Sequence, residues 1–150
     1  AEFADMDGWN AESDAATMLN GLGIDTEFHY ATMGDLPGPL KVKVLLAQAL
    51  FGNPDILLLD EPFGALDAIT RTVLQDELLK VHQEMPKTFL LVTHDINEAL
   101  KLGNRILVMN EGKVCQFGTP REIVQHPEDP FVETLIRSAR EQERLWEELL

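Results

Sequence analysis

Two adjacent acidic residues, Asp60 and Glu61, follow a run of four apolar residues at positions 56–59. A short apolar run bounded by turn-forming residues predicts a strand buried on both faces of a parallel sheet. Open α/β sheets bind ligands at the carboxyl ends of their strands, where nucleotide hydrolysis needs two carboxylate roles. Because side chains alternate along a strand, one acid could hold Mg²⁺ through water and the other could polarise the attacking water. Acids after a strand also often cap the next turn, so the pair alone leaves that alternative open.

A histidine, His94, follows a second candidate strand. Residues 88–93 are β-branched or apolar, which favours a buried strand. An imidazole at its end could donate a hydrogen bond to a phosphate group near physiological pH. Taken alone, a histidine in such a position is more often a loop residue without a catalytic role. We interpret His29, His82 and His126 as structural, because no such pattern surrounds them.

The composition is typical of one globular domain, with 150 residues, 45% apolar and 25% charged. A net charge of −14 argues against a nucleic-acid surface, because phosphates are bound by clustered Lys and Arg. The single cysteine, Cys115, excludes an internal disulfide and paired-thiol sites, and fits a reducing, cytoplasmic location. No apolar run approaches the ~20 residues that span a bilayer, and no basic signal-peptide start is present. Membrane association is therefore expected only through a partner.

Helices and strands are expected to alternate around these residues. Apolar periodicity and turn signals predict helices over 10–22, 42–50, 67–84, 96–102 and 130–150, and a hairpin with strands 105–109 and 113–117. Thr-Pro-Arg-Glu at 119–122 matches a capping box with proline at the first helical position. The predicted fold class is α/β, with flanking helices, an N-terminal helical subdomain and a small, mainly parallel sheet formed by 56–59, 88–93 and the hairpin.

Three motifs resemble those of ABC-type ATPases and occur in the same order. Ile-Leu-Leu-Leu-Asp-Glu-Pro at 56–62 is similar to the Walker B strand and catalytic glutamate. Gly-Ala-Leu-Asp at 64–67 resembles the D-loop, which communicates across the ATPase dimer. Val-Thr-His-Asp at 92–95 resembles the switch-histidine motif. The first string is highly specific, and the fold implied by the resemblance is part of a P-loop NTPase.

The resemblance implies a role for each candidate residue. Glu61 would be the general base, and Asp60 would be the residue that holds Mg²⁺. His94 would contact the γ-phosphate, and Asp67 of the D-loop would contribute to nucleotide binding. The implied cofactors are ATP and Mg²⁺. The implied partner is a membrane permease, which would place the chain at the cytoplasmic face of the membrane.

Two departures from the ABC pattern affect phosphate binding. No G-x-x-x-x-G-K-S/T motif occurs in the 150 residues, so the amides, lysine and hydroxyl that cradle the phosphates are not provided. Where the family has L-S-G-G-Q, the chain reads Leu-Pro-Gly-Pro-Leu at 36–40, and Pro37 and Pro39 supply neither a hydroxyl nor a free amide. Gly38 is the matching glycine and the remaining candidate for nucleotide contact, although the two prolines favour a plain loop that leads into a helix. We expect ATP binding by the isolated chain to be weak.

The resemblance itself has two parts. Residues from about 56 to 150 look like ATPases of osmoprotectant importers, whereas residues 1 to about 60 resemble the ABC-F branch, soluble ATPases that act at the ribosome. The junction would fall inside the strand at 56–59, which indicates a recombined or engineered chain. Its divisions would be a helical subdomain at 1–53, an α/β core at 54–126 and a C-terminal helix at 127–150.

Two functions are compatible with these observations. The first is a fragment of an ABC transporter ATP-binding subunit, inactive alone but contributing to ATP-driven solute import beside a complete subunit. The second is a non-enzymatic folding or interaction module of recombined origin. In either case we expect self-association, because strand surface would be left uncovered. A second means of association is a set of apolar side chains near the end of the last helix: Leu145, Trp146, Leu149 and Leu150.

Overall fold

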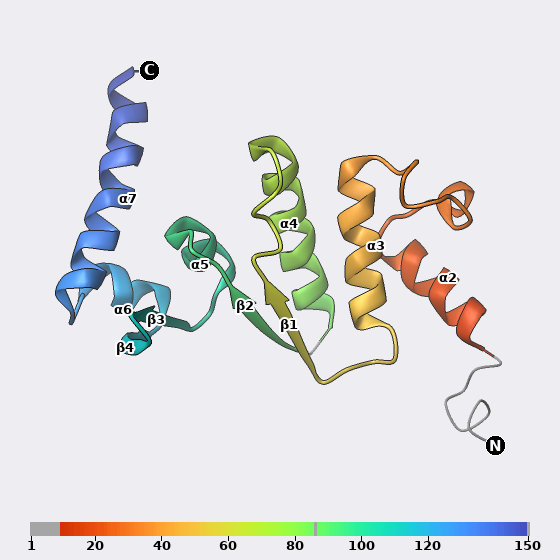
Figure 1. The fold of residues 1–150 in the computed structure, drawn as a ribbon, viewed down its shortest axis with the longest axis horizontal. Helices are drawn as coiled ribbons and strands as arrows, with labels where there is room; N and C mark the ends of the chain where they lie inside the picture. The colour runs from red at the N-terminus through yellow and green to blue at the C-terminus, as the bar shows by residue number, and fades with distance from the viewer. Residues whose placement is uncertain (1–9, 86, 150) are drawn as a thin grey trace. The chain divides into compact units, whose positions relative to one another are not determined.

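A computed structural model describes residues 10–85 and 87–149 (Figure 1). Its helices are α2 (Ala11–Gly21), the 3-10 helix η1 (Thr26–Phe28), α3 (Gly38–Leu50), α4 (Ala68–Glu84), α5 (Ile96–Leu102), α6 (Pro120–Gln125) and α7 (Pro130–Leu149). Its strands are β1 (Ile56–Asp60), β2 (Thr88–Val92), β3 (Ile106–Asn110) and β4 (Lys113–Gly118). These elements confirm the α/β class and the predicted order of helices and strands.

Strands β1 and β2 pair with each other and run parallel. At one end, the Thr88 N–H donates to the Asp55 carbonyl oxygen at 3.0 Å. At the other, the Glu61 N–H donates to the Val92 carbonyl oxygen at 2.9 Å. Since residue numbers rise in the same direction on both strands, their carboxyl ends meet at one edge. The predicted parallel pairing is therefore confirmed.

The prediction that these strands are buried on both faces is wrong. Leu57 is only 5% exposed, but Ile56, Leu58 and Leu90 are 65%, 62% and 56% exposed. Phe89 packs its ring edge-on against His82 of α4, with ring centroids 5.1 Å apart. Phe89 of β2 therefore packs against α4, whereas Ile56, Leu58 and Leu90 stay exposed. The apolar run at 56–59 is therefore buried on one face only, although runs of this kind are typical of strands buried on both faces.

The prediction that the hairpin lies at the edge of the same sheet is wrong. In the described residues, β3 and β4 form a separate two-stranded sheet. Strands β3 and β4 pair antiparallel, from Ile106 opposite Gly118 to Asn110 opposite Lys113. The tight turn is closed by Glu111 and Gly112, which both have positive φ. Between β2 and β3 the chain turns into α5, and no described strand lies between them to join the sheets.

The described chain divides into two compact units, which comprise the described parts of 1–58 with 63–90, and of 59–62 with 91–150. In the first unit α3 packs against α2 and α4. The Lys43 ammonium lies 3.3 Å from the Glu77 carboxylate and links α3 to α4. A hydrogen bond from Lys80, and then the charge of Lys43, lower the pKa of Glu77. The predicted division at residues 53 and 126 stays a prediction.

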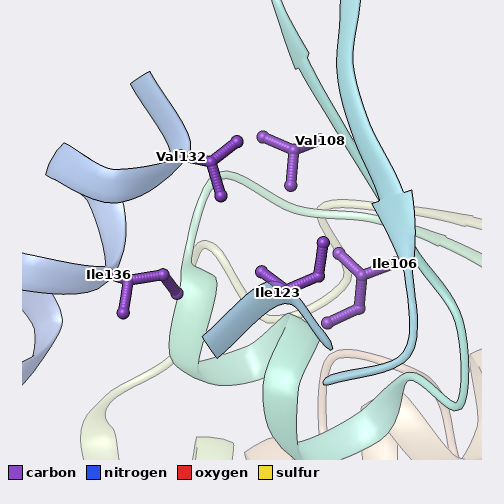
Figure 2. Packing of buried hydrophobic residues seen from close by; sticks show 5 residues of the cluster. All are labelled: Ile106, Val108, Ile123, Val132 and Ile136. Atoms are coloured by element: carbon purple, nitrogen blue, oxygen red, sulfur yellow. The ribbon is translucent and has the colours of Figure 1, made fainter. Parts of the chain in front are cut away.

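The second unit has a core formed by the hairpin, α6 and α7. Figure 2 shows its five buried side chains pointing toward one another: Ile106, Val108, Ile123, Val132 and Ile136. The predicted capping box of α6 is present, because the Thr119 and Glu122 side chains each accept a hydrogen bond from the other residue's backbone N–H. The first turns of α7 are thus docked within the same chain.

The last turns of α7 carry the predicted apolar contact surface. Its members Leu145, Trp146, Leu149 and Leu150 lie outside the side chains that the structure describes. That prediction therefore stays untested. Within the described residues, no helix combines the length and the apolar character needed to cross a bilayer.

Truncation of Ile123 tests the assignment of the second core. This side chain is 0% exposed. Ile123→Ala is expected to lower the free energy of unfolding by about 2–5 kcal/mol, because it removes buried methyl groups and leaves a cavity. Urea denaturation followed by circular dichroism measures the loss. The matched variant Leu107→Ala, at a site 51% exposed on the outer face of β3, should change stability much less. Equal losses would contradict this core.

Candidate functional site

Glu61 occupies the first position beyond β1 and has an unusual backbone conformation. Its φ is +43°, in the left-handed region that non-glycine residues seldom adopt. The hydrogen bond from its N–H to Val92 extends the parallel ladder by one residue, after which the chain turns away. A residue held in this region costs on the order of 1–3 kcal/mol and is more common at functional sites. The pairing with β2 thus holds the Glu61 carboxylate at the carboxyl edge.

His94 lies at the same edge and contacts Glu61. Its Nδ1 is 3.1 Å from Glu61 Oε1. Because a carboxylate only accepts, the imidazole Nδ1–H donates in this hydrogen bond and Nε2 is left for another partner. The side chains of His94 and Glu61 are 75% and 51% exposed, so a ligand can reach both. Of the predicted site residues, these two are brought into direct contact.

The loop that carries His94 is held by hydrogen bonds on both sides of the histidine. The Thr93 hydroxyl donates to Glu98 Oε2 at 2.7 Å and accepts from the Asp95 N–H at 3.1 Å. Asp95 caps α5 by accepting from the Asn97 N–H at 2.8 Å. Neither Thr93 nor Glu98 is among the site residues predicted from the sequence. An acid three residues after an Asp cap is a capping-box spacing, and that signal could have drawn attention to Glu98.

Asp60 is the last residue of β1, and its side chain is exposed. The described residues contain no group of three or more His, Cys, Asp or Glu side chains that could enclose a metal ion. Mg²⁺ commonly keeps several waters and is held by one or two carboxylates together with substrate phosphates. An exposed single carboxylate therefore fits Mg²⁺ bound with a nucleotide rather than a dedicated metal site.

Asp67 and Gly38 belong to the first unit, where each begins a helix. Asp67 is the N-cap of α4, and its Oδ1 accepts from the N–H groups of Ile69 and Thr70 at 3.1 and 3.0 Å. Hydrogen bonding from the Thr70 side chain, then from its backbone N–H, lowers the pKa of Asp67. Gly38 is the first residue of α3, after Pro37, and no side chain caps this helix. A Cβ added at Gly38 would meet no atom within 4 Å.

No protein-family model matches the chain, but individual proteins do. It is 42% identical over 140 residues to the glycine betaine/carnitine transport ATP-binding protein GbuA of Listeria monocytogenes, covering 90% of this chain and 34% of that protein. It is 40% identical over 136 residues to the glycine betaine/proline betaine transport system ATP-binding protein ProV of Escherichia coli, covering 91% and 34%. The chain spans about a third of the length of these relatives.

Solved structures extend the similarity to the fold. The chain superposes on cbiO1 of Clostridium perfringens, part of the ABC transporter complex cbiONQ, with a TM-score of 0.68 and 28% identity, over 77% of this chain and 46% of that one. The chain shares its fold with part of an ABC ATPase domain. A second such domain, in its ADP conformation, gives a TM-score of 0.69 over 81% of this chain and 49% of that one; at 20% identity it shows the fold alone.

The pH dependence of stability tests the capping role of Asp67. The pKa of its carboxyl is below the ordinary value of 3.8 in the folded chain. Its stabilising contribution is therefore complete above that value and is lost as the pH falls through the lower folded-state pKa. Asp67→Asn keeps the capping oxygen but cannot titrate. The stability advantage of Asp67 over Asn should shrink as the pH falls from about 7 to about 2.

Urea denaturation across that pH range measures the difference between the two chains. A third variant, Asp67→Ala, has no acceptor for Ile69 and Thr70 and should be the least stable of the three at neutral pH. A difference between Asp and Asn that stays constant down to the lowest pH would contradict this account.

Proposed function

We propose that the chain forms part of the ATP-binding subunit of an ABC importer for osmoprotectants or related solutes, with Glu61 and His94 in its ATPase site. The observation that carries the proposal is the 3.1 Å contact between His94 Nδ1 and Glu61 Oε1. It lies at the carboxyl edge of two parallel strands, where open α/β sheets bind their ligands. The similarity to GbuA and ProV supports the solute class.

Glu61 would act as the general base. Its carboxylate accepts a proton from water, whose oxygen forms a bond to the γ-phosphorus while the bond from that phosphorus to the bridging oxygen of ADP breaks. His94 would donate Nδ1–H to Glu61 and Nε2–H to a γ-phosphate oxygen, which requires the imidazolium form. In this arrangement His94 would bond both to the base and to the γ-phosphate that the activated water attacks. Its role is to orient the carboxylate and stabilise the charge of the transition state.

Three further residues have proposed roles around this pair. Asp60 would hold Mg²⁺, which neutralises charge that develops on the phosphate oxygens. Asp67 would take part in contacts across a dimer of ATP-binding subunits. Gly38 would present its backbone N–H to the γ-phosphate of the opposite subunit, at the start of a helix in which Pro39 has no N–H to offer.

The partners in this proposal are a second ATP-binding subunit and a membrane permease, with the chain at the cytoplasmic face. The alternative, a recombined module without turnover, comes from the resemblance of residues 1–60 to the ABC-F branch. The importer relatives cover nine-tenths of the chain, which favours the importer assignment for most of these residues as well. Recombination stays a hypothesis.

A fusion protein provides the direct test of the ATPase role. The segment of E. coli ProV that precedes the position aligned with Ile56 would be joined to residues 56–150 of this chain. The fusion is expected to release phosphate from ATP, and Glu61→Gln should lower kcat by about 10²–10⁴-fold because the general base is lost. Glu111→Gln, at the exposed hairpin turn, is the matched control. Equal kcat for the two Gln variants would contradict the proposal.

The 150-residue chain alone should behave differently. Positioning of the phosphates supplies most of the catalysis of phosphoryl transfer, and the sequence contains no P-loop motif to provide it. Its ATP hydrolysis is therefore expected to be no faster than that of its own Glu61→Gln variant. Phosphate release clearly above that of the variant would show that other residues of the chain position the phosphates.

Self-association of the chain is a separate expectation. Ile56, Leu58 and Leu90 form an exposed apolar face on β1 and β2, and the same face on a second copy would be complementary to it. Light scattering without ATP or Mg²⁺ should show a mass that rises with protein concentration. It should also rise with salt, because the net charge of −14 opposes association.

A double variant, Leu58→Thr with Leu90→Thr, should reduce association while it preserves β-propensity. Val114→Thr changes a side chain that is 60% exposed on β4 and should leave the mass unchanged. A monomer at all concentrations and salt levels would disprove self-association. Equal effects of the double variant and of Val114→Thr on the mass would show that the contact between copies lies elsewhere.

A further inference from the structure

Glu98 is a buried acid for which the proposed ATPase chemistry has no use. It lies in the first turn of α5 and is 6% exposed. A carboxylate is rarely this buried unless it is paired or hydrogen-bonded, because removing it from water is costly. Its environment therefore has to compensate for burial through specific partners, and Thr93 is one of them.

The direction of each hydrogen bond in this group follows from the donor inventory. Glu98 Oε2 can only accept, so the Thr93 hydroxyl uses its one proton in the 2.7 Å bond to Glu98. The hydroxyl oxygen is then oriented to accept from the Asp95 N–H, at 3.1 Å. Glu98 thus sets the orientation of a group that bonds to the backbone on the far side of His94.

His94 lies between the two residues that this group holds. Its own side chain is 75% exposed, so packing does little to restrain it. What restrains the residue is its backbone: Thr93 is tied to Glu98, and Asp95 is tied to Thr93 and begins α5. Ala99 N–H also donates to the Asp95 carbonyl oxygen, at 3.2 Å. These bonds restrain the backbone on both sides of His94, and the bond from Thr93 ends at Glu98.

We infer that Glu98 is a positioning residue, which acts through the Thr93 hydroxyl to hold His94 in contact with Glu61. Its importance for ATP hydrolysis rests on the function proposed above. Its effect on the contact between His94 and Glu61 can be tested without that function. An alternative role is simple stabilisation of α5, because an acid in the first helical turn interacts favourably with the helix dipole. Glu98→Gln separates the two roles, since Gln keeps an accepting oxygen but loses the charge.

The test follows the contact by the ring ¹⁵N shifts of His94 in the 150-residue chain, without nucleotide. The signal is the change in these shifts that Glu61→Gln produces. In the parent chain this change should be clear. The same change should be seen when Glu61→Gln is introduced into a chain that carries Glu98→Gln, because the glutamine side chain can still accept from Thr93. In a chain that carries Glu98→Ala, Glu61→Gln should no longer change the His94 shifts. A parent chain that shows no response, or a response that survives Glu98→Ala, would overturn the inference.

A second pair of variants covers the case in which Glu98→Ala does not fold. Thr93→Ser keeps the hydroxyl and should keep the response, whereas Thr93→Val removes it and should lose the response. Ile123→Val, in the core of the same unit, lowers stability without touching the loop and should leave the response intact. If it does not, the response reports stability alone and the inference falls. Failure of the fusion protein to hydrolyse ATP would refute the proposed function but leave these shifts unaffected.

Discussion

The parallel pairing of β1 with β2 is the interaction on which the candidate site depends. Two hydrogen bonds at opposite ends of the pair align the strands, and the second is made by Glu61 itself. Because parallel strands end at the same edge, residues 33 positions apart in the sequence meet there, as the contact of Glu61 with His94 shows. A one-residue slip in this register would turn the side chains to the opposite faces and separate the pair.

The same strands show how packing limits what a sequence pattern can reveal. Apolar runs at 56–59 and 88–93 correctly indicated parallel strands, because parallel pairing and apolar composition usually occur together. They predicted burial on both faces of each strand, and the expectation of uncovered strand surface did not say which side chains would be exposed; these are Ile56, Leu58 and Leu90. Burial depends on which other segments are present to pack against a strand, and composition alone does not contain that information.

Local signals were more reliable than long-range ones. The start of α6 was predictable because the capping box of Thr119 and Glu122 is formed within one turn. The helix expected over 67–84 is α4, and the structure adds that Asp67 is its N-cap. The separation of the hairpin from β1 and β2 was not predictable, because it depends on pairing between distant segments. Glu98 was missed although a local signal was present, because its capping-box spacing from Asp95 does not reveal that its side chain accepts from the Thr93 hydroxyl.

The contact between Glu61 and His94 is too weak to determine where these two residues lie. An exposed pair such as Glu61 and His94 is screened by water and contributes about 0–1 kcal/mol, too little to impose its own geometry. The strained backbone of Glu61 costs at least as much, so the contact cannot be what holds Glu61 in place. The strand ladder holds the backbone of Glu61, and the bonds of Thr93 restrain the backbone beside His94. In the proposed function, a site arranged in this way would offer a carboxylate and an imidazole to a phosphate held by other residues.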